Sequence, residues 1–346
     1  RVLGLGDLGP LASLPVMEGK SVIYKIFSGI NAVPIPIDSK DIDEFVNIVS
    51  KISVTAGGIH LEDIESPFCF DALEKLQNIL DVPVWHDDQQ GTAAITLAGL
   101  INAFDLVGKD LKRSKLVLVG AGSANLALFR LLKAYSVDMG RVIILDSKGV
   151  LSRNRPDIQK IKESNRWKYD ALMGSNFDNI DDIKDAFIDS DAVIGFSAPG
   201  SITPDLIKLM SKKPIVFANA NPIPEIDPKV ALKAGAFIVS TGRSDFPNQI
   251  NNSIVFPGLF RGILDSRSKK IDDGTAISAA IELASFAKKK GISRNYIVPR
   301  MDELDIHPRV AAAVAEYSSN MGYSLIEGDK KFFYELAKKR IRYLTK

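Results

Sequence analysis

Residues 115–135, KLVLVGAGSANLALFRLLKAY, carry the strongest indication of the fold. The first five residues form a short Val/Leu run typical of a buried parallel strand, and a helical pattern starts at Asn125. Between them lies the glycine turn Gly120-Ala121-Gly122-Ser123-Ala124. A strand, a glycine turn and a helix in this order can bind a dinucleotide, because the pyrophosphate sits on the helix N-terminus. The alternative is an ordinary βαβ turn, and an acid at the end of the next strand favours the dinucleotide site. The stretch therefore predicts the first unit of a Rossmann-type domain.

The residues after the next apolar run, RVIILD (141–146), bear on the choice of dinucleotide. Asp146 ends that run at the distance expected of the acid that binds the adenosine ribose hydroxyls. An acid there favours the free 2′-hydroxyl of NAD. Ser147 and Lys148 follow at once and could instead bind the 2′-phosphate of NADP, so the sequence favours NAD and leaves NADP open. Asn125 departs from the pattern, since its position usually holds Gly or Ala.

The rest of the chain extends this pattern into an α/β protein of two domains. Further Val/Ile-rich runs at 191–196, 214–219 and 236–241 alternate with helical stretches, which predicts a doubly wound parallel sheet. Residues 1–95 also mix strands and helices and predict a second α/β unit. We expect residues 96–265 to form the dinucleotide-binding domain, and the helical segment 266–346 to complete the domain of residues 1–95.

Composition excludes several other classes of protein. The 346 residues suffice for about two domains, and 44 Lys and Arg against 42 Asp and Glu give a net charge of +2. A net charge this close to zero gives no indication that the protein binds nucleic acid or an anionic membrane. The single cysteine, Cys69, rules out an internal disulfide and suits a reducing cytoplasm. We find no signal peptide, and no apolar run close to the roughly 18–20 residues of a membrane span.

A second glycine pattern, Gly4-Leu-Gly6-Asp-Leu-Gly9, lies near the start of the chain. Pro10 follows it directly and Pro15 comes soon after, so we expect no helix to begin there. Without a helix the pattern is a tight backbone turn rather than a dinucleotide site. The chain begins at Arg1 rather than Met, which suggests that some N-terminal sequence is missing.

Acidic residues outside the dinucleotide unit suggest a metal site. Glu62 and Asp63 lie in GGIHLEDIESP, and Asp87 and Asp88 in PVWHDDQQGTAA, while Lys20 ends LPVMEGK. Carboxylates without a Cys or His cluster suit a hard cation such as Mg²⁺ or Mn²⁺. Taken singly, each acid has an ordinary interpretation as a helix start or an N-cap, and Lys20 as a surface charge. Their joint occurrence beside a dinucleotide domain favours the metal site.

These stretches together resemble the malic enzymes, especially their short bacterial and archaeal form. The matching stretches also include RVLGLGDLG, GAGSAN, FSAPG, ANANPIPEI and TGRSDFPNQINNSIVFPG, and run in family order from residue 1 to about 262. Members of this family oxidise L-malate with NAD(P) and a divalent metal, and decarboxylate it to pyruvate and CO₂. The resemblance also implies a homodimer.

The resemblance assigns roles residue by residue. Glu62, Asp63 and Asp88 match the metal ligands, Lys20 matches the general base, and Asp87 matches the acid that orients this lysine. Arg1 matches an arginine that binds the substrate carboxylate. Asn221 and Asn252 match asparagines near the substrate and the nicotinamide, and Gly120 to Ala124 match the pyrophosphate turn.

One family role has no matching residue in this chain. The family's general acid is a tyrosine that lies upstream of RVLGLGDLG, so we expect the chain as given to bind cofactor and metal but to complete the cycle poorly. Tyr24 does not match that position and is interpreted as core.

The remaining candidates have ordinary interpretations. His60, His86 and His307 are isolated, and His86 beside the acids could make a supporting hydrogen bond. Cys69 is interpreted as core, and Trp85 as packing under the site. Two alternatives stay open: a malolactic enzyme, which releases lactate, and a catalytically dead dinucleotide-binding module.

Overall fold

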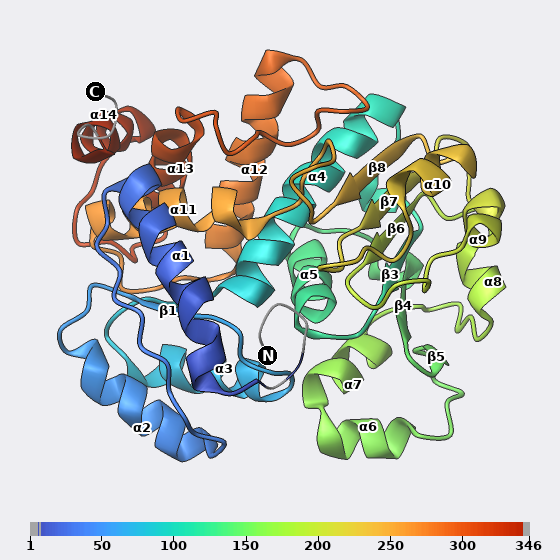
Figure 1. Cartoon of the computed structure of the whole chain (residues 1–346), viewed down its shortest axis with the longest axis horizontal. Coiled ribbons are helices and arrows are strands. Elements are labelled where there is room, and N and C mark those ends of the chain that lie inside the picture. The colour runs from blue at the N-terminus through green and yellow to red at the C-terminus, as the bar shows by residue number, and fades with distance from the viewer. Residues whose placement is uncertain (1–5, 7, 342–346) are drawn as a thin grey trace. The chain divides into compact units, whose positions relative to one another are not determined.

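The computed structural model describes residues 6 and 8–341, which divide into two compact units (Figure 1). The first unit holds the residues up to Ile95, together with Asn252–Phe286 and those from Pro299 onward. The second unit holds Thr96–Asn251 and Ala287–Val298.

A six-stranded sheet in the order β5-β4-β3-β6-β7-β8 forms the centre of the second unit. All neighbouring strands pair in parallel except β4 and β5 at one edge. Every residue of β3, β6, β7 and β8 is buried, as expected for a parallel sheet that is covered on both faces. The predicted α/β class and its five parallel strands are confirmed. The strands are β3 (Leu116–Val119), β4 (Val142–Asp146), β5 (Gly149–Val150), β6 (Ala192–Gly195), β7 (Ile215–Ala218) and β8 (Ile238–Thr241).

The helices of the second unit connect these strands, and their apolar faces complete its core. Side chains from the strands, such as Val117 and Val216, pack with Phe187 and Ile207 from the helices. The helices are α5 (Ser123–Ala134), α6 (Ile158–Ser164), α7 (Arg166–Met173), α8 (Ile183–Phe187), α9 (Pro204–Leu209) and α10 (Pro228–Lys233), with short 3₁₀ turns η2 (Leu111–Arg113) and η3 (Met139–Arg141).

The first unit is mainly helical around two short parallel strands, β1 (Ile59–Leu61) and β2 (Val84–His86). Leu61 and Val84 pack with Phe45, Val49 and Leu73 into a small core. The other elements are α1 (Pro10–Ser28), α2 (Ile42–Ser53), α3 (Phe68–Ile79), the π-helical turn η1 (Asp87–Gly91), the 3₁₀ turn η4 (Asn252–Ile254), α11 (Phe256–Ser266), α13 (Ile306–Asn320) and α14 (Lys330–Ile341). Two further helices, α4 (Thr92–Val107) and α12 (Asp273–Lys290), each run from the first unit into the second.

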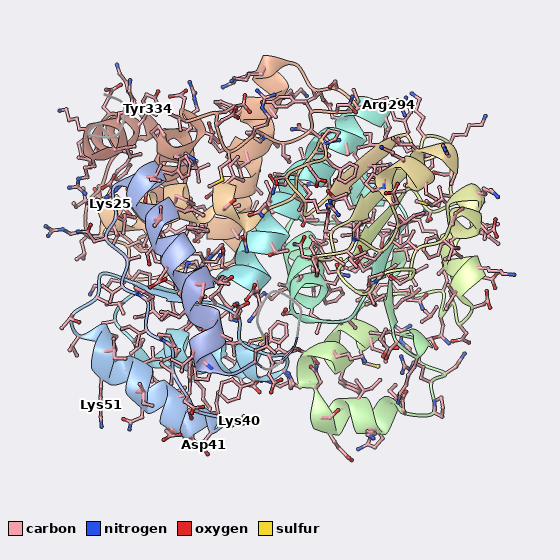
Figure 2. The ribbon with its side chains drawn as sticks, in the orientation of Figure 1. Lys25, Lys40, Asp41, Lys51, Arg294 and Tyr334 are labelled. Carbon is pink, nitrogen blue, oxygen red and sulfur yellow. The ribbon has the colours of Figure 1, made fainter. Side chains whose placement is uncertain are left out.

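Charged side chains lie at the outside of α1 and α2. Figure 2 shows Lys25 and Lys51 pointing away from the ribbon, and Asp41 at the start of α2. The Asp41 carboxylate caps α2, because its Oδ1 accepts hydrogen bonds from the backbone N–H groups of Asp43 and Glu44 at 2.9 and 2.8 Å.

The expectation that no helix begins after Gly9 is wrong. Helix α1 starts at Pro10 and continues through Pro15 to Ser28. A proline at the first helical position is favourable, because its missing N–H would have no partner there and its φ angle already suits a helix. Pro15 lies inside the helix, where it cannot donate the usual hydrogen bond and its ring crowds the carbonyl four residues earlier.

The predicted end of the dinucleotide-binding domain at residue 265 differs from the observed division. Helix α11 lies in the first unit, because Phe256 and Phe260 pack their rings against Tyr24. Residues 287–298 lie in the second unit instead, where Asn248 Nδ2 donates to the carbonyl of Arg294 at 2.7 Å.

One helical segment of the described residues is longer and more apolar than the sequence analysis allowed. Residues 87–107 form a 21-residue helical segment that could cross a membrane by length and composition. Most of it is buried within the protein, and apolar core helices of this length also occur in proteins that have no membrane-spanning segment.

Candidate active site

The two acidic pairs meet because they follow two neighbouring parallel strands. In the register of β1 and β2, His60 lies opposite Trp85 and Leu61 opposite His86. The next residues after the two strands are Glu62-Asp63 and Asp87-Asp88. Because the strands are parallel, both pairs lie at the same carboxyl end of the sheet. A parallel pair therefore brings together acids that are 25 residues apart in the sequence.

Glu62, Asp63 and Asp88 form a cluster that could hold a cation. One carboxylate oxygen from each lies within 4.8 Å of the other two. The backbone N–H of Asp63 donates to Asp88 Oδ2 at 2.8 Å, which fixes the two turns against each other. Asp63 has a φ angle of 55°, a strained conformation for a residue other than glycine. Three hard oxygen ligands in this arrangement fit Mg²⁺ or Mn²⁺.

Lys20 reaches this cluster from α1. Its Nζ lies 2.5 Å from Asp87 Oδ2 and 3.2 Å from Glu62 Oε2, and 4.6 Å from the centre of the Phe256 ring. Burial alone would lower the pKa of Lys20, but the charges of Asp87 and Glu62 outweigh it and raise that pKa above its ordinary value. Lys20 is therefore an ammonium group in this arrangement.

Asp87 and Asp88 differ in their surroundings although they are adjacent. Asp87 is fully buried and is held on both oxygens: Oδ2 by Lys20, and Oδ1 by the indole Nε1 of Trp85 at 3.0 Å. Asp88 is a third exposed and faces Asp63. Trp85 does more than pack under the site, because it donates a hydrogen bond to Asp87.

Gly91 makes room for the Asp87 carboxylate. A Cβ atom at Gly91 would lie 2.0 Å from Asp87 Oδ1, so no larger residue fits without moving that group. Residues 87–91 form a π-helical turn, which is wider than an α-helical turn and is often found at functional sites.

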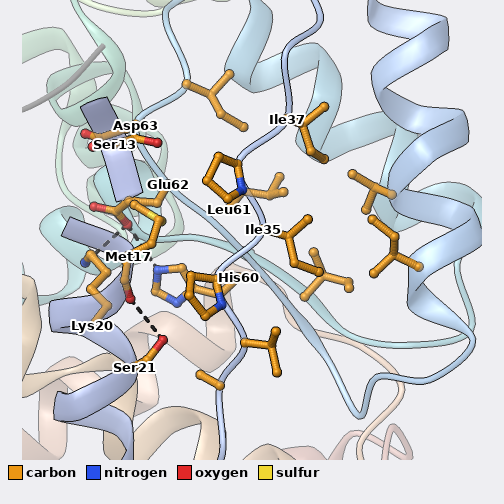
Figure 3. Close-up of a pocket in the computed structure, with 18 of the residues that line it drawn as sticks. Ser13, Met17, Lys20, Ser21, Ile35, Ile37, His60, Leu61, Glu62 and Asp63 are labelled. Atoms are coloured by element: carbon orange, nitrogen blue, oxygen red, sulfur yellow. Dashed lines mark hydrogen bonds and ion pairs between the residues drawn. The ribbon is translucent and has the colours of Figure 1, made fainter. Parts of the chain in front are cut away.

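A cavity of about 600 Å³ in the first unit opens beside these residues (Figure 3). Lys20, Glu62 and Asp63 line its polar end together with His60. Apolar side chains such as Ile35, Ile37 and Leu61 line the remainder. The cavity therefore reaches Lys20 and two of the three clustered carboxylates, those of Glu62 and Asp63.

Tyr24 and His60 join the cluster, although no role was predicted for either from the sequence. Tyr24 Oη lies 2.7 Å from His60 Nδ1, and His60 Nε2 lies 3.0 Å from Glu62 Oε2. Burial lowers the pKa of His60 to about 3, and burial also raises the pKa of Tyr24 well above its usual value. Their spacing held a usable signal, because Lys20 and Tyr24 share one helix face and His60 and Glu62 share one strand face.

The side chains of the remaining two histidines and of the cysteine take no part in the hydrogen bonds of the cluster. His86 Nδ1 is 4.0 Å from Asp88 Oδ2, too far for the supporting hydrogen bond that its position beside the acids left possible. His307 is buried against Phe27, and its ring nitrogens have no hydrogen-bond partner among the described residues. Cys69 is a buried free thiol in α3.

In the second unit, the predicted pyrophosphate turn lies between β3 and α5. Gly120 has a φ angle of 102°, and a Cβ there would lie 2.5 Å from the carbonyl oxygen of Phe196, so the turn requires glycine. Helix α5 starts at Ser123 with no side-chain cap, which leaves its first N–H groups for a phosphate. Asn125 stabilises the turn, because its Nδ2 donates to the carbonyls of Val119 and Gly120 at 3.0 and 2.9 Å.

Cations surround Asp146 at the end of β4. Arg155 Nη1 donates to Asp146 Oδ1 at 2.8 Å, and Lys168 Nζ donates to Asp146 Oδ2. Burial alone would raise the pKa of Asp146, but the hydrogen bonds from Lys168 and Arg155 outweigh it and lower that pKa. Arg155 also pairs with Asp157, as does Lys148. Three cations thus meet two carboxylates.

Glu225 is a further residue that the sequence analysis missed. Its carboxylate accepts hydrogen bonds from the backbone N–H groups of Ser197 at 2.7 Å and Ala220 at 3.1 Å. It therefore ties together the loops that follow β6 and β7, on the edge of the sheet where dinucleotides bind.

The two predicted asparagines lie in different units. Asn221, in the loop after β7, is exposed and its side chain lies against Gly242. Asn252 begins η4 in the first unit, and its Cβ would lie 3.2 Å from a Cβ at Gly91. Arg1 lies outside the described residues.

Family models match both parts of the chain. A model described as "Malic enzyme, NAD binding domain" matches residues 89–319, and one described as "Malic enzyme, N-terminal domain" matches residues 1–77. The glycine pattern at residues 4–9 falls outside the NAD-binding match, so this match, rather than the absence of a helix, supports its exclusion as a dinucleotide site.

Curated relatives agree with these models. The chain is 42% identical over 339 residues to a bifunctional malic/malolactic enzyme of Bacillus subtilis, covering 98% of the chain and 81% of the relative. It is 43% identical to an NAD-dependent malic enzyme of Geobacillus stearothermophilus, and 44% identical to an NADP-dependent malic enzyme of Rhizobium meliloti. These matches cover 93% and 83% of the chain, but only 66% and 37% of those two relatives.

Solved structures show the same similarity. A crystal structure of Entamoeba histolytica malic enzyme is 44% identical and superposes with a TM-score of 0.96, covering 99% of this chain and 72% of that one. A malic enzyme from Pyrococcus horikoshii is 42% identical with a TM-score of 0.93, covering 99% and 79%.

Proposed function

This chain belongs to the malic enzyme family, and from that premise we propose that it oxidises L-malate with NAD or NADP and decarboxylates the product to pyruvate and CO₂. The observation that carries the proposal is the meeting of three carboxylates, Glu62, Asp63 and Asp88, beside the buried pair of Lys20 and Asp87. That arrangement supplies a cation site, and beside it a lysine that can accept a proton once a bound cation favours its neutral amine.

Glu62, Asp63 and Asp88 are the proposed ligands of Mg²⁺ or Mn²⁺. Either ion supplies a Lewis acid that lowers the pKa of a coordinated hydroxyl and stabilises the negative charge that develops when CO₂ leaves. The three carboxylates contribute oxygen ligands only, which is the preference of these hard cations. Their mutual repulsion also favours a bound cation.

Lys20 is the proposed base that removes the proton from the C2 hydroxyl of malate. A lysine can accept a proton only as the neutral amine, and Asp87 and Glu62 oppose that form by raising its pKa. A divalent charge beside Glu62 acts in the opposite direction and favours the neutral amine. Asp87, fixed by Trp85, orients the amine toward the substrate.

Three residues are proposed to bind the substrate or the nicotinamide. Arg1 would hold the remote carboxylate of malate with two parallel hydrogen bonds. The amides of Asn221 and Asn252 would bind the substrate and the nicotinamide, as the family resemblance implies.

The glycine turn of the second unit is the proposed pyrophosphate site, with Asp146 at the adenosine ribose. The uncapped start of α5 supports this assignment. Because Asp146 is already compensated by Arg155 and Lys168, it opposes a 2′-phosphate less than a lone carboxylate would. We propose that the enzyme uses NAD and accepts NADP as well.

The test is the reduction of NAD or NADP by L-malate with Mn²⁺, at matched cofactor concentrations and with the products identified by NMR. We expect pyruvate, CO₂ and reduced cofactor, all dependent on Mn²⁺. Lactate without net cofactor reduction would instead support a malolactic enzyme, an activity that the Bacillus subtilis relative carries in its name. Absence of cofactor reduction even in a single turnover would support the inactive module, because lack of the general acid impairs only the protonation that comes after hydride transfer.

Two further properties are proposed with the activity: a cytoplasmic location, which suits the single buried thiol of Cys69, and a homodimer. Apolar side chains on one face of α1 support the homodimer, since Leu11, Val22 and Ile26 are 81%, 55% and 42% exposed. Light scattering of Val22→Glu should show monomers where the unmodified chain shows dimers, and a monomeric unmodified chain would refute the homodimer.

A further inference from the structure

A chain of three hydrogen-bonded side chains ends on Glu62. Tyr24 Oη lies 2.7 Å from His60 Nδ1, and His60 Nε2 lies 3.0 Å from Glu62 Oε2. Lys20 Nζ approaches the same Glu62 oxygen to 3.2 Å. Figure 3 shows His60 and Lys20 on either side of the Glu62 carboxylate.

The direction of each hydrogen bond follows from what each group can donate. As an ionised metal ligand Glu62 can only accept, so in that state His60 Nε2 carries the proton and donates to Glu62. A neutral imidazole then has an acceptor at Nδ1, which leaves the Tyr24 hydroxyl as the donor. The Tyr24 hydroxyl therefore donates its hydrogen bond to His60 Nδ1.

Aromatic rings hold the pair in place. The rings of Phe256 and Phe260 lie 4.7 and 5.5 Å from the Tyr24 ring. The same two rings lie 5.3 and 5.9 Å from His60. Enclosed by this apolar wall, the imidazole has little freedom to turn, and the oxygen of Glu62 that it contacts is fixed as well.

We infer that Tyr24 and His60 are positioning residues for Glu62. They hold Oε2 between His60 and Lys20 and leave the second carboxylate oxygen of Glu62 for the cation. The inference rests on the proposed function, because it takes Glu62 to be a metal ligand. It also gives Tyr24 a role other than proton transfer to the substrate, since its hydroxyl donates to His60.

Mn²⁺ affinity, measured by titration calorimetry on the full chain, tests the inference. Partners that orient a metal ligand usually contribute about 10- to 100-fold to metal affinity or activity. We expect His60→Leu to weaken Mn²⁺ binding about tenfold or more. His60→Gln should recover most of that loss, because the glutamine amide can donate to Glu62 from the position of Nε2.

Tyr24→Phe separates positioning from proton transfer. As a positioning residue, its loss should weaken Mn²⁺ binding severalfold and lower turnover only to a similar extent. If Tyr24 protonated the substrate instead, Tyr24→Phe would stop pyruvate formation with Mn²⁺ affinity unchanged, and the inference would be overturned. Should His60→Leu fail to fold, Tyr24→Phe decides the question alone.

Tyr323→Phe is the matched control. It removes a tyrosine hydroxyl that also donates to a carboxylate, Asp272 Oδ2 at 2.8 Å, and should leave Mn²⁺ affinity unchanged. If the unmodified chain does not bind Mn²⁺, the proposed function fails. If it binds and His60→Leu and Tyr24→Phe bind equally well, only the positioning role fails.

Discussion

Two groups of charged side chains, one in each unit, have opposite imbalances. In the first unit, four carboxylates, those of Glu62, Asp63, Asp87 and Asp88, face one ammonium group, that of Lys20. In the second unit, Asp146 and Asp157 face three cations, which are Lys148, Arg155 and Lys168. An excess of negative charge favours the binding of a cation, and an excess of positive charge favours the binding of a phosphate.

Carboxylates in this protein suit different chemistry depending on their partners. Asp88 is only partly compensated and suits a metal ligand, whereas Asp146 is fully engaged by cations and suits contact with a ribose or its phosphate. Asp87 is a third case, a buried acid held by Trp85 and Lys20. Four predictions test this difference, ranked by expected effect, and a fifth concerns the stability of the first unit.

Replacing Lys20 should have the largest effect. A general base contributes about 10²- to 10⁴-fold to rate, so Lys20→Met should lower kcat by that order. Mn²⁺ affinity should stay the same or increase, because a positive charge beside the carboxylates is removed. Steady-state rates and calorimetry measure the two effects, and a loss of Mn²⁺ binding would mean that Lys20 only stabilises the cluster.

Asp88→Asn should weaken Mn²⁺ binding by about 100-fold or more, since loss of a direct ligand should exceed the 10- to 100-fold effect of outer partners. Asp87→Asn is the matched variant on the neighbouring residue. It should chiefly lower turnover with the metal still bound. Equal loss of Mn²⁺ affinity in both variants would show that the two acids do not divide their roles.

Two glycine substitutions should each affect the function of one unit only. Overpacking typically costs about 1–3 kcal/mol, so Gly91→Ala should displace Asp87 and lower turnover about tenfold. Affinity for ADP-ribose, which lacks the nicotinamide that Asn252 is proposed to contact, should stay unchanged when measured by calorimetry. Gly120→Ala should weaken NADH binding by a similar factor while Mn²⁺ affinity stays unchanged. Fluorescence titration of NADH and calorimetry with Mn²⁺ measure both. Crossed effects would contradict the assignment of cofactor and metal to separate groups.

Lys168→Ala should change the choice of cofactor. Loss of a hydrogen bond to a charged group costs about 1.5 kcal/mol, so binding of the probe 2′,5′-ADP should weaken about tenfold while binding of AMP changes little. Lys148→Ala, which alters a more exposed cation paired to Asp157, should have a smaller effect. Equal weakening for both probes would place Lys168 in a purely structural role.

His307→Phe should reduce the acid sensitivity of the first unit, which contains all three histidines of the chain. Burial lowers the pKa of His307 from 6.5 to about 3, so between these values the unfolded chain binds the extra proton. This contribution to stability is complete above pH 6.5 and is lost as the pH falls toward 3.

Urea unfolding at pH 7 and pH 5 tests this prediction. The loss of unfolding free energy between the two should be about 2 kcal/mol smaller in His307→Phe than in the unmodified chain. Phe keeps the ring contact with Phe27. An equal loss in both proteins would contradict the buried neutral state of His307.

Much of the second unit could be predicted from the sequence, because its signals are local. A Val/Leu run, a glycine turn and a helix lie within 21 residues, and parallel strands buried on both faces read as continuous apolar runs. The same local reasoning failed at Pro10, because a proline that breaks a helix interior is favourable at its first turn. Local patterns also could not show that α11 belongs to the first unit, since its ring contacts with Tyr24 depend on the tertiary structure.

In the first unit, the sequence by itself determined which acids and which lysine were present, and the family resemblance suggested their roles. Only the tertiary structure decided how they divide the charge. The register of β1 and β2 sets the two acidic pairs side by side, and α1 brings Lys20 to Asp87 and Tyr24 to His60. The physical reason is that hydrogen bonds and ion pairs depend on distance in space, whereas sequence patterns report only neighbours along the chain.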